Sequence, residues 1–263
     1  MKTHTSFPSL LFSAAVVVLL CAQTVRAEAS LQSPSPTPQS SLTAEQRGDL
    51  FVARQQYLAA IDAYRQAPVN AITLNKLGIA YHHLFALDEA RKDYQKALLI
   101  RPNYPEAINN LGAAEFAQGH YKQSIRLYRK ALKLMPDSAV IAANLGTAYF
   151  AHGKYQSGLE AYQTAFRLDP DVFAGDSGQI IPGPSQARDR ARQDYCLAEL
   201  FAEAGNQDRA IEYLRKALND GFHDRNRLMQ DSDFARLRKT PEFAQLMAEE
   251  KIRETASASS PAH

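Results

Sequence analysis

Histidine and cysteine are the residues in this chain that could hold a metal ion or act as a nucleophile, and their spacing favours neither. His82 and His83 are adjacent, so on a helix their side chains point about 100° apart and cannot share one ion. His120 and His152 belong to separate segments, and Cys196 has no partner at a zinc-ligand spacing. The H-E-x-x-H, Walker and G-x-S-x-G motifs are absent from the sequence. We therefore predict that the protein is not an enzyme and that it has no cofactor or metal site.

Asparagines offer a different chemistry, because each side-chain amide can both donate and accept hydrogen bonds. Asn110 and Asn144 stand directly before a Leu-Gly pair, while Asn75 and Asn109 lie one residue further back in the same pattern. Such side chains suit the backbone of an extended peptide. Hydrogen bonding within the protein explains the same placement equally well, and the sequence leaves both alternatives open.

The elements that position these residues follow a repeat. Leu77-Gly78, Leu111-Gly112 and Leu145-Gly146 recur with a step of 34 residues. The same step relates Ala90, Ser124 and Gly158; Tyr94, Tyr128 and Tyr162; Ala97, Ala131 and Ala165; and Pro102, Pro136 and Pro170. A constant period of this length indicates a stack of repeated units rather than one globular core. A helical bundle with coincidental prolines is the alternative.

With small and aromatic residues at these spacings, the chain resembles the tetratricopeptide repeat family, whose unit is a helix, a turn and a second helix. The resemblance implies an all-α fold: a right-handed superhelical stack of about five such units with C-terminal capping helices. In the three regular units it places first helices at about 71–84, 105–118 and 139–152, and second helices at about 87–100, 121–134 and 155–168.

The resemblance also assigns packing roles to the small residues. The expected pairs, at the closest approach of two helices, are Gly78 with Ala90, Gly112 with Ser124, and Gly146 with Gly158. A glycine inside a helix costs about 1 kcal/mol relative to alanine, which favours a packing reason for these positions. Gly119 and Gly153 are predicted to take the left-handed conformation in the turns between paired helices.

Curved repeat stacks expose their first helices on an inner, concave face. In tetratricopeptide repeat proteins similar to this chain, partner contacts come from first-helix positions that include the residue before Leu-Gly. The resemblance therefore implies a groove for a protein or peptide, made by Ile72, Asn75, Lys76, Ile79, Asn109, Asn110, Ala113, Ala143, Asn144, Thr147 and Cys196. The family's clamp for a C-terminal carboxylate is not expected, because Lys76 is the main cation in this set. Cys196 is either a lone groove thiol or a buried, unreactive cysteine.

The repeats divide the chain into segments. Units one to four take residues 44–170 and unit five takes residues 189–220. Between them lies an inserted loop at 171–188, whose glycines and prolines break the helical pattern. A mobile loop and a dedicated binding loop are both open interpretations. Capping helices at 221–254 and a disordered tail at 255–263 complete the prediction.

The first unit is four residues shorter than the others. Thr43 and Gln46 form a T-x-x-Q capping box at its start. Pro68 cannot continue a helix, so the second helix of this unit is predicted to end about one turn early.

The segment after unit five resembles a closing module that follows such repeats in some bacterial proteins. Asp231 is predicted to cap a helix that carries Phe234 and Leu237, and Thr240-Pro241 is predicted to begin the next helix. The apolar residues of the module are expected to cover the open edge of unit five, since terminal repeats need such a cap.

Residues 1–27 are predicted to be a secretory signal. The uncharged run from Leu10 to Ala22 is thirteen residues long, short for a spanning helix but suited to a signal. Residues 28–43 are rich in serine and proline and are interpreted as a linker. The protein is therefore expected to be periplasmic or secreted, with no membrane insertion after cleavage. An uncleaved N-terminal anchor is the alternative.

The composition argues against a charged partner. The chain has 30 basic and 28 acidic residues, and loss of Lys2 and Arg26 with the signal leaves 28 of each. That balance does not favour nucleic acid or an anionic membrane surface. The leading hypothesis is an exported, non-catalytic scaffold that binds a peptide or protein. A structural component that self-associates is the second hypothesis, and an enzyme with a site in the insertion is the third.

Overall fold

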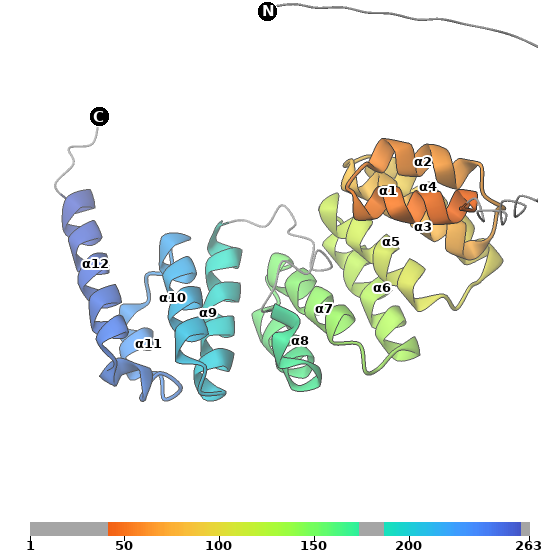
Figure 1. The fold of residues 1–263 in the computed structure, drawn as a ribbon. Coiled ribbons are helices and arrows are strands. Elements are labelled where there is room, and N and C mark those ends of the chain that lie inside the picture. The colour runs from red at the N-terminus through yellow and green to blue at the C-terminus, as the bar shows by residue number, and fades with distance from the viewer. Residues whose placement is uncertain (1–41, 174–186, 259–263) are drawn as a thin grey trace, which may run out of the picture. The chain divides into compact units, whose positions relative to one another are not determined.

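The computed structural model describes residues 42–173 and 187–258, and every regular element in those two ranges is a helix (Figure 1). The predicted signal at 1–27, nearly all of the linker at 28–43, the middle of the inserted loop and residues 259–263 lie outside the described residues. No helix in the described ranges combines the length and apolar character needed to cross a membrane.

The first eight helices pair in sequence order, and each second helix also packs on the next first helix. The pairs are α1 (Ala44–Ala53) with α2 (Tyr57–Arg65), α3 (Ala71–His83) with α4 (Leu87–Ile100), α5 (Pro105–Ala117) with α6 (Tyr121–Leu134), and α7 (Ala139–Ala151) with α8 (Tyr155–Leu168). First helices also touch one another, α3 with α5 and α5 with α7. Helices α3 to α8 coincide with the predicted ranges to within one residue, so the 34-residue period defines the architecture.

Local capping explains where several of these helices begin. Thr43 Oγ1 accepts a hydrogen bond from Gln46 N at 3.1 Å while Gln46 Oε1 accepts from Thr43 N at 2.9 Å, which confirms the capping box. Asn70 Oδ1 accepts from the first backbone N–H groups of α3. Ser138 does the same for α7, and Pro105 begins α5 because its missing N–H would have no helical partner there.

A glycine in each of the four units packs against a tyrosine ring. The pairs are Gly48 with Tyr64, Gly78 with Tyr94, Gly112 with Tyr128, and Gly146 with Tyr162. A Cβ atom added at Gly146 would lie 2.3 Å from the Tyr162 ring, so no larger residue fits without movement. The same Cβ would lie 3.1 Å from the Gly158 carbonyl oxygen, so the predicted contact of Gly146 with Gly158 is confirmed, and the tyrosine ring is a closer contact that the prediction did not include. Each tyrosine follows the expected small residue by four positions, on the same helix face, and reaches over it to the glycine.

The turn between paired helices requires a left-handed residue. Gly119 and Gly153 have φ of +80° and +74°, as predicted, and Gly205 repeats the conformation in the fifth unit. Gln55 and Phe85 occupy the same turn position in the first two units, with φ of 58° and 57°. Left-handed backbone at a residue with a Cβ costs about 1–2 kcal/mol, so these two turns are strained.

The fifth unit, α9 (Ala187–Glu203) with α10 (Gln207–Asn219), packs on the fourth in a different direction from the regular repeats. Near the starts of α8 and α9, Tyr155 OH donates to Asp189 Oδ1 at 2.9 Å. Near their ends, the rings of Phe166 and Phe201 meet edge to face at 5.3 Å. Helices α8 and α9 therefore run the same way. Between the regular units the link from one second helix to the next first helix is four residues long and forces the chain to reverse. The much longer insertion before α9 allows a parallel arrangement.

The closing module contains α11 (Arg225–Gln230), a 3-10 turn η2 (Leu237–Lys239) and α12 (Pro241–Ala258). Asp224, rather than Asp231, caps a helix here, since its Oδ1 accepts from Arg227 N at 2.9 Å. Asp231 instead accepts from Asp233 N at 3.0 Å, which favours a local turn over the predicted helix through Phe234.

The last helix begins as predicted and ends later. Thr240 Oγ1 accepts from Phe243 N at 3.3 Å, and Pro241 is the first helical residue. Because α12 extends to Ala258, residues 255–258 are helical rather than part of a disordered tail.

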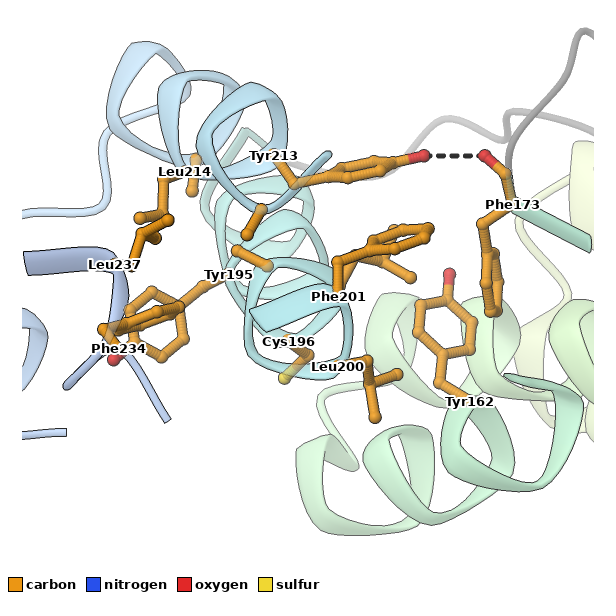
Figure 2. Close-up of a cluster of buried hydrophobic side chains, with 14 of the residues drawn as sticks. Tyr162, Phe173, Tyr195, Cys196, Leu200, Phe201, Tyr213, Leu214, Phe234 and Leu237 are labelled. Carbon is orange, nitrogen blue, oxygen red and sulfur yellow. Dashed lines mark hydrogen bonds between the residues drawn. The ribbon is translucent and has the colours of Figure 1, made fainter. Parts of the chain in front are cut away.

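The largest core joins the fourth unit, the fifth unit and the closing module, and Figure 2 shows its centre. A short 3-10 helix, η1 (Pro170–Phe173), contributes the carbonyl of Phe173, which accepts from Tyr213 OH at 2.8 Å. Tyr195 points the other way, stacking on Phe222 and meeting Phe234 edge to face. Phe234, Leu237, Phe243 and Leu246 are each at most 3% exposed, so the closing module seals unit five.

Candidate functional site

Four asparagines form a hydrogen-bonded series across α3, α5 and α7, and we call these residues, Asn75, Asn109, Asn110 and Asn144, the asparagine series. Asn144 Nδ2 donates to Asn109 Oδ1 at 3.1 Å. Asn109 Nδ2 donates to Asn110 Oδ1 at 3.2 Å, and Asn110 Nδ2 donates to Asn75 Oδ1 at 3.0 Å. Each bond between helices joins residues 35 apart, one more than the repeat length. The regular stacking of the units therefore also aligns these amides.

Burial divides the asparagine series into two kinds of residue. Asn75 and Asn144 are 5% and 4% exposed, whereas Asn109 and Asn110 are half-buried. An amide has two N–H donors, and the bonds of the series use one donor of Asn109 and one of Asn110. The outer two amides are therefore held in place by the inner two and keep hydrogen-bonding capacity at the surface.

Tyr104 interacts with Asn75, a buried member of the asparagine series, and the sequence pattern did not predict this role. Burial raises the pKa of the Tyr104 hydroxyl, while a hydrogen bond with Asn75 acts to lower it. Tyr104 lies in the link before α5, outside the helical period, so no register position pointed to it.

Lys76 is paired within the protein. Its Nζ atom lies 2.7 Å from Glu45 Oε1 and 2.8 Å from Asp49 Oδ2, both on α1. Partial burial acts to lower the pKa of Lys76, but its hydrogen bonds to the two carboxylates raise it above the usual value. The sequence pattern did not identify Glu45 and Asp49 as partners of Lys76, because both lie in the shortened first unit, which departs from the regular repeats. The cation therefore serves the contact between the first two units.

Three predicted groove residues are covered by neighbouring helices. Ala113 and Ala143 are 2% and 0% exposed, and Thr147 is 7% exposed. Thr147 Oγ1 donates to the Ala143 carbonyl at 3.1 Å and lies 2.8 Å from Tyr162 OH. Their predicted role in partner contact is corrected: at these positions the helices approach so closely that only small or internally bonded side chains fit.

Ile72 and Ile79 flank the asparagine series on α3. Ile72 is 39% exposed and Ile79 is half-buried, so both present apolar surface beside the amides. Apolar contacts next to fixed polar groups are what a peptide site requires.

Cys196 does not join the series. Burial, the largest influence, raises the pKa of its thiol to about 12, so the group is a protonated thiol at neutral pH. Its side chain lies in the core near Leu200, between α9 and the fourth unit (Figure 2). The reversed direction of α9 places this residue away from the amides, and the asparagine series ends at α7.

Among the described residues, no group of three or more His, Cys, Asp or Glu side chains is placed to hold a metal ion. Glu115 is the clearest buried carboxylate of units one to four, and Arg91 Nε and His120 Nδ1 engage it at 3.0 and 2.8 Å. These contacts link α4, α5 and the turn that follows α5, so the charges stabilise the packing of the helices.

Helix pairs that repeat every 34 residues and pack glycine against tyrosine define a helical repeat solenoid. Residues 69–137 and 105–171 match the family model described as tetratricopeptide repeat. Residues 69–171 therefore contain tetratricopeptide repeats.

Two curated relatives share part of this sequence. The heat-shock protein cognate co-chaperone sgt12 of Aspergillus fumigatus is 35% identical over 92 residues, which are 34% of this chain and 27% of that protein. The small glutamine-rich tetratricopeptide repeat-containing protein 2 of Saccharomyces cerevisiae is 32% identical over 83 residues, 30% of this chain and 24% of that protein. The matches thus span about a quarter of each relative.

A solved structure shares the fold over a longer stretch. The APC/C hetero-tetramer Cut9–Hcn1 includes a chain that superposes with a TM-score of 0.50 at 17% sequence identity. The superposition covers 79% of this chain and 35% of that one, and it concerns the fold alone.

Proposed function

We propose that this protein is a non-catalytic scaffold that binds an extended peptide segment of a protein partner across α3, α5 and α7. The observation that carries the proposal is the asparagine series. Its outer amides, on Asn109 and Asn110, are fixed in orientation by hydrogen bonds to buried neighbours. Side chains ordered before binding lose less entropy when a partner arrives.

The chemistry of the surface suits a peptide backbone. Each outer amide can offer an N–H and a carbonyl oxygen, and a backbone presents the complementary groups at regular spacing. Ile72 and Ile79 add apolar contact beside them. The match of the repeats to the tetratricopeptide repeat family supports a scaffold role, as does the co-chaperone function in the name of one relative.

We further propose that the scaffold is exported, with residues 1–27 removed as a signal. The apolar run from Leu10 to Ala22 and the small residues before Glu28 support cleavage at that point. The mass of the protein purified from the envelope or medium tests this. A mass that begins at Glu28 supports cleavage, and a mass that begins at Met1 in the membrane fraction supports an anchor instead.

The binding proposal is tested by changing the outer amides and the apolar flank separately. Immobilised protein lacking residues 1–27 is used to recover partners from an envelope extract. We expect Asn109→Ala/Asn110→Ala and Ile72→Glu each to reduce recovery of a partner at least tenfold. Leu58→Glu is the matched control, because Leu58 is 70% exposed and lies on α2, outside the surface formed by α3, α5 and α7.

Stability must be measured alongside recovery. Asn110→Ala removes a donor from the buried Asn75, which is expected to cost about 1–3 kcal/mol. Ile72→Glu changes a partly exposed residue and is expected to leave the melting temperature near that of the wild type. If the folded Ile72→Glu variant recovers the same partner as fully as Leu58→Glu, the binding proposal is wrong.

A second candidate function is self-association, and a repeated apolar row favours it. Ile100, Leu134 and Leu168 end the second helices α4, α6 and α8 at a spacing of 34 residues. They are 55%, 39% and 40% exposed. Light scattering over a range of protein concentrations tests this role. A rise in mass that Leu134→Glu abolishes supports self-association, and a monomer at all concentrations argues against it.

A further inference from the structure

A pocket of about 360 Å³ lies where the fifth unit meets the fourth. Its walls come from the beginning of α8, from one face of α9 and from the bend at residues 221–224. The parallel direction of α8 and α9 creates it, since that arrangement brings the first turn of α9 beside Tyr155. The pocket shares Cys196 with the predicted groove and contains no member of the asparagine series.

The charged groups of the pocket are mostly basic. Arg188, Arg192 and Arg227 line it, and Asp224 is its acidic residue. Asp224 is already engaged, because its side chain caps α11. Arg227 pairs with Glu199 at 3.0 Å, but burial, the largest influence, raises the pKa of that carboxyl to about 7. The charge of Arg227 is nonetheless balanced within the protein, because a second carboxylate, Asp231, also interacts with it.

Arg192 is the group best placed to bind an anion. Its guanidinium carbon lies over the Tyr155 ring, 4.1 Å from the ring centroid. Among the described residues, no carboxylate lies within ion-pair distance of Arg192, and the side chain is exposed to the pocket. A guanidinium supported on its face by an aromatic ring keeps N–H groups at its edge, where a carboxylate can bind with both oxygens.

Aromatic rings complete the walls. Phe150, Tyr155, Tyr195 and Phe222 line the pocket, and the rings of Tyr195 and Phe222 stack with centroids 4.1 Å apart. A cavity of this volume, in which aromatic side chains meet a few converging polar groups, falls in the range of small-ligand sites. Its lining therefore combines recognition of a planar apolar group with recognition of a negative charge.

We propose that this pocket binds an aryl carboxylate, with Arg192 holding the carboxylate and Tyr155 and Phe222 contacting the aromatic ring. The ligand is either a free aromatic acid or the C-terminal aromatic residue of a peptide, since both present the same groups. The site is separate from the asparagine series, so the proposal stands or falls independently of the proposed function.

The absence of tryptophan from the chain makes a clean fluorescence test possible. A Phe222→Trp variant of the protein is titrated with 3-phenylpropionate and with its neutral amide, 3-phenylpropionamide. We expect the acid to shift the tryptophan emission with a Kd of about 1 mM or lower, and the amide to bind at least tenfold more weakly. Calorimetry with the wild-type protein checks that the reporter has not created the site.

Three further variants test the role of the arginine. Arg192→Gln is expected to weaken binding of 3-phenylpropionate about tenfold, and Arg192→Lys to weaken it less, because lysine keeps the charge but not the planar fork. Arg129→Gln, an exposed change on α6 outside the pocket, is expected to have no effect. Equal binding of acid and amide, no saturable binding of either, or full binding by the folded Arg192→Gln variant would each overturn the proposal.

The source of the ligand is decided by a peptide probe. Acetyl-Gly-Gly-Phe with a free C-terminus is compared with its C-terminal amide and with 3-phenylpropionate. Tighter binding of the free peptide than of 3-phenylpropionate assigns the pocket to a peptide C-terminus, and weaker binding assigns it to a free aromatic acid. Ile72→Glu should leave both affinities unchanged, which separates this result from any failure of the binding face.

Discussion

At the scale of single residues, His82 shows how one substitution within the repeat changes the physical behaviour of the protein. It takes the place that Phe116 and Phe150 occupy in the next two units, where both rings are buried. Its Nε2 atom is buried and has no hydrogen-bond partner among the described residues. Burial, helped by the nearby His83, lowers the pKa of His82 to about 4.

The pH dependence of stability follows from this shift. The folded protein keeps His82 neutral, whereas the unfolded chain protonates it below about pH 6.5, so stability is lost as pH falls from about 6.5 towards 4. On this acidification, we expect the free energy of unfolding of the His82→Phe variant to fall by about 1–3 kcal/mol less than that of the wild type. Urea unfolding of variant and wild type at pH 7.5 and pH 4.5 measures it.

Comparing the two proteins at each pH cancels the contributions of other groups. Asp194 and Glu199 affect the pH dependence of stability in the opposite direction to His82, because burial raises the pKa of each carboxyl to about 7. A His223→Asn control, at an exposed position, should reproduce the wild-type profile. If His82→Phe and the wild type lose the same stability on acidification, the assignment to His82 is wrong.

At the scale of helices, the contact between each glycine and its tyrosine ring determines how tightly two helices pack. Tyr162 is fully buried, touches Phe150 and Phe173, and is hydrogen-bonded to Thr147, so its ring cannot move aside. The clearance differs among units: an added Cβ would lie 2.3 Å from the ring at Gly146 but 2.9 Å at Gly112.

This difference predicts an order of effects. Gly146→Ala should destabilise the protein by about 2–3 kcal/mol and Gly112→Ala by less, because overpacking in a core costs about 1–3 kcal/mol. Thermal melts followed by far-ultraviolet circular dichroism measure both. Gly153→Ala is the control for backbone strain, since φ there is +74° and an added Cβ meets nothing within 4 Å. A smaller loss at Gly146 than at Gly112 would argue against ring contact as the cause.

The sequence predicted the helices better than their contacts. A 34-residue period with prolines and glycines at fixed places located α3 to α8 almost to the residue, since these signals are local. The pairing of each glycine with a small residue did not include the tyrosine ring, because sequence spacing does not show that Tyr94 or Tyr162 lies against the glycine. The helix expected after Asp231 failed for a similar reason: an acidic residue caps a turn as readily as a helix.

At the scale of the whole molecule, the direction of the fifth unit was the feature that the sequence could not provide. The repeat pattern of α9 and α10 matches the earlier units, yet a long insertion removes the constraint that makes regular units alternate. The four asparagines were found from their register, and their mutual hydrogen bonds follow from regular stacking. Cys196 shared that register but not that environment, since α9 is reversed.

The closing module is predicted to be required for solubility. Removal of residues 222–263 would uncover the side of the core that Phe234, Leu237, Phe243 and Leu246 now seal. Exposed repeat edges associate, so we expect the truncated protein to aggregate. Sedimentation and light scattering of the truncated and complete proteins test this. A soluble, monomeric truncation with the wild-type melting temperature would show that the module is not a structural cap.

The most direct test of the central claim, that α3, α5 and α7 form the binding face, is site-specific photo-crosslinking in cells. A benzophenone amino acid is placed at Ile72, beside the asparagine series, or at Ile100 on α4; both residues are partly exposed, at 39% and 55%. We predict a crosslinked partner at position 72 that is absent at position 100 and reduced by Asn109→Ala/Asn110→Ala. Crosslinking at position 100 alone, or equally at both positions, would contradict the account.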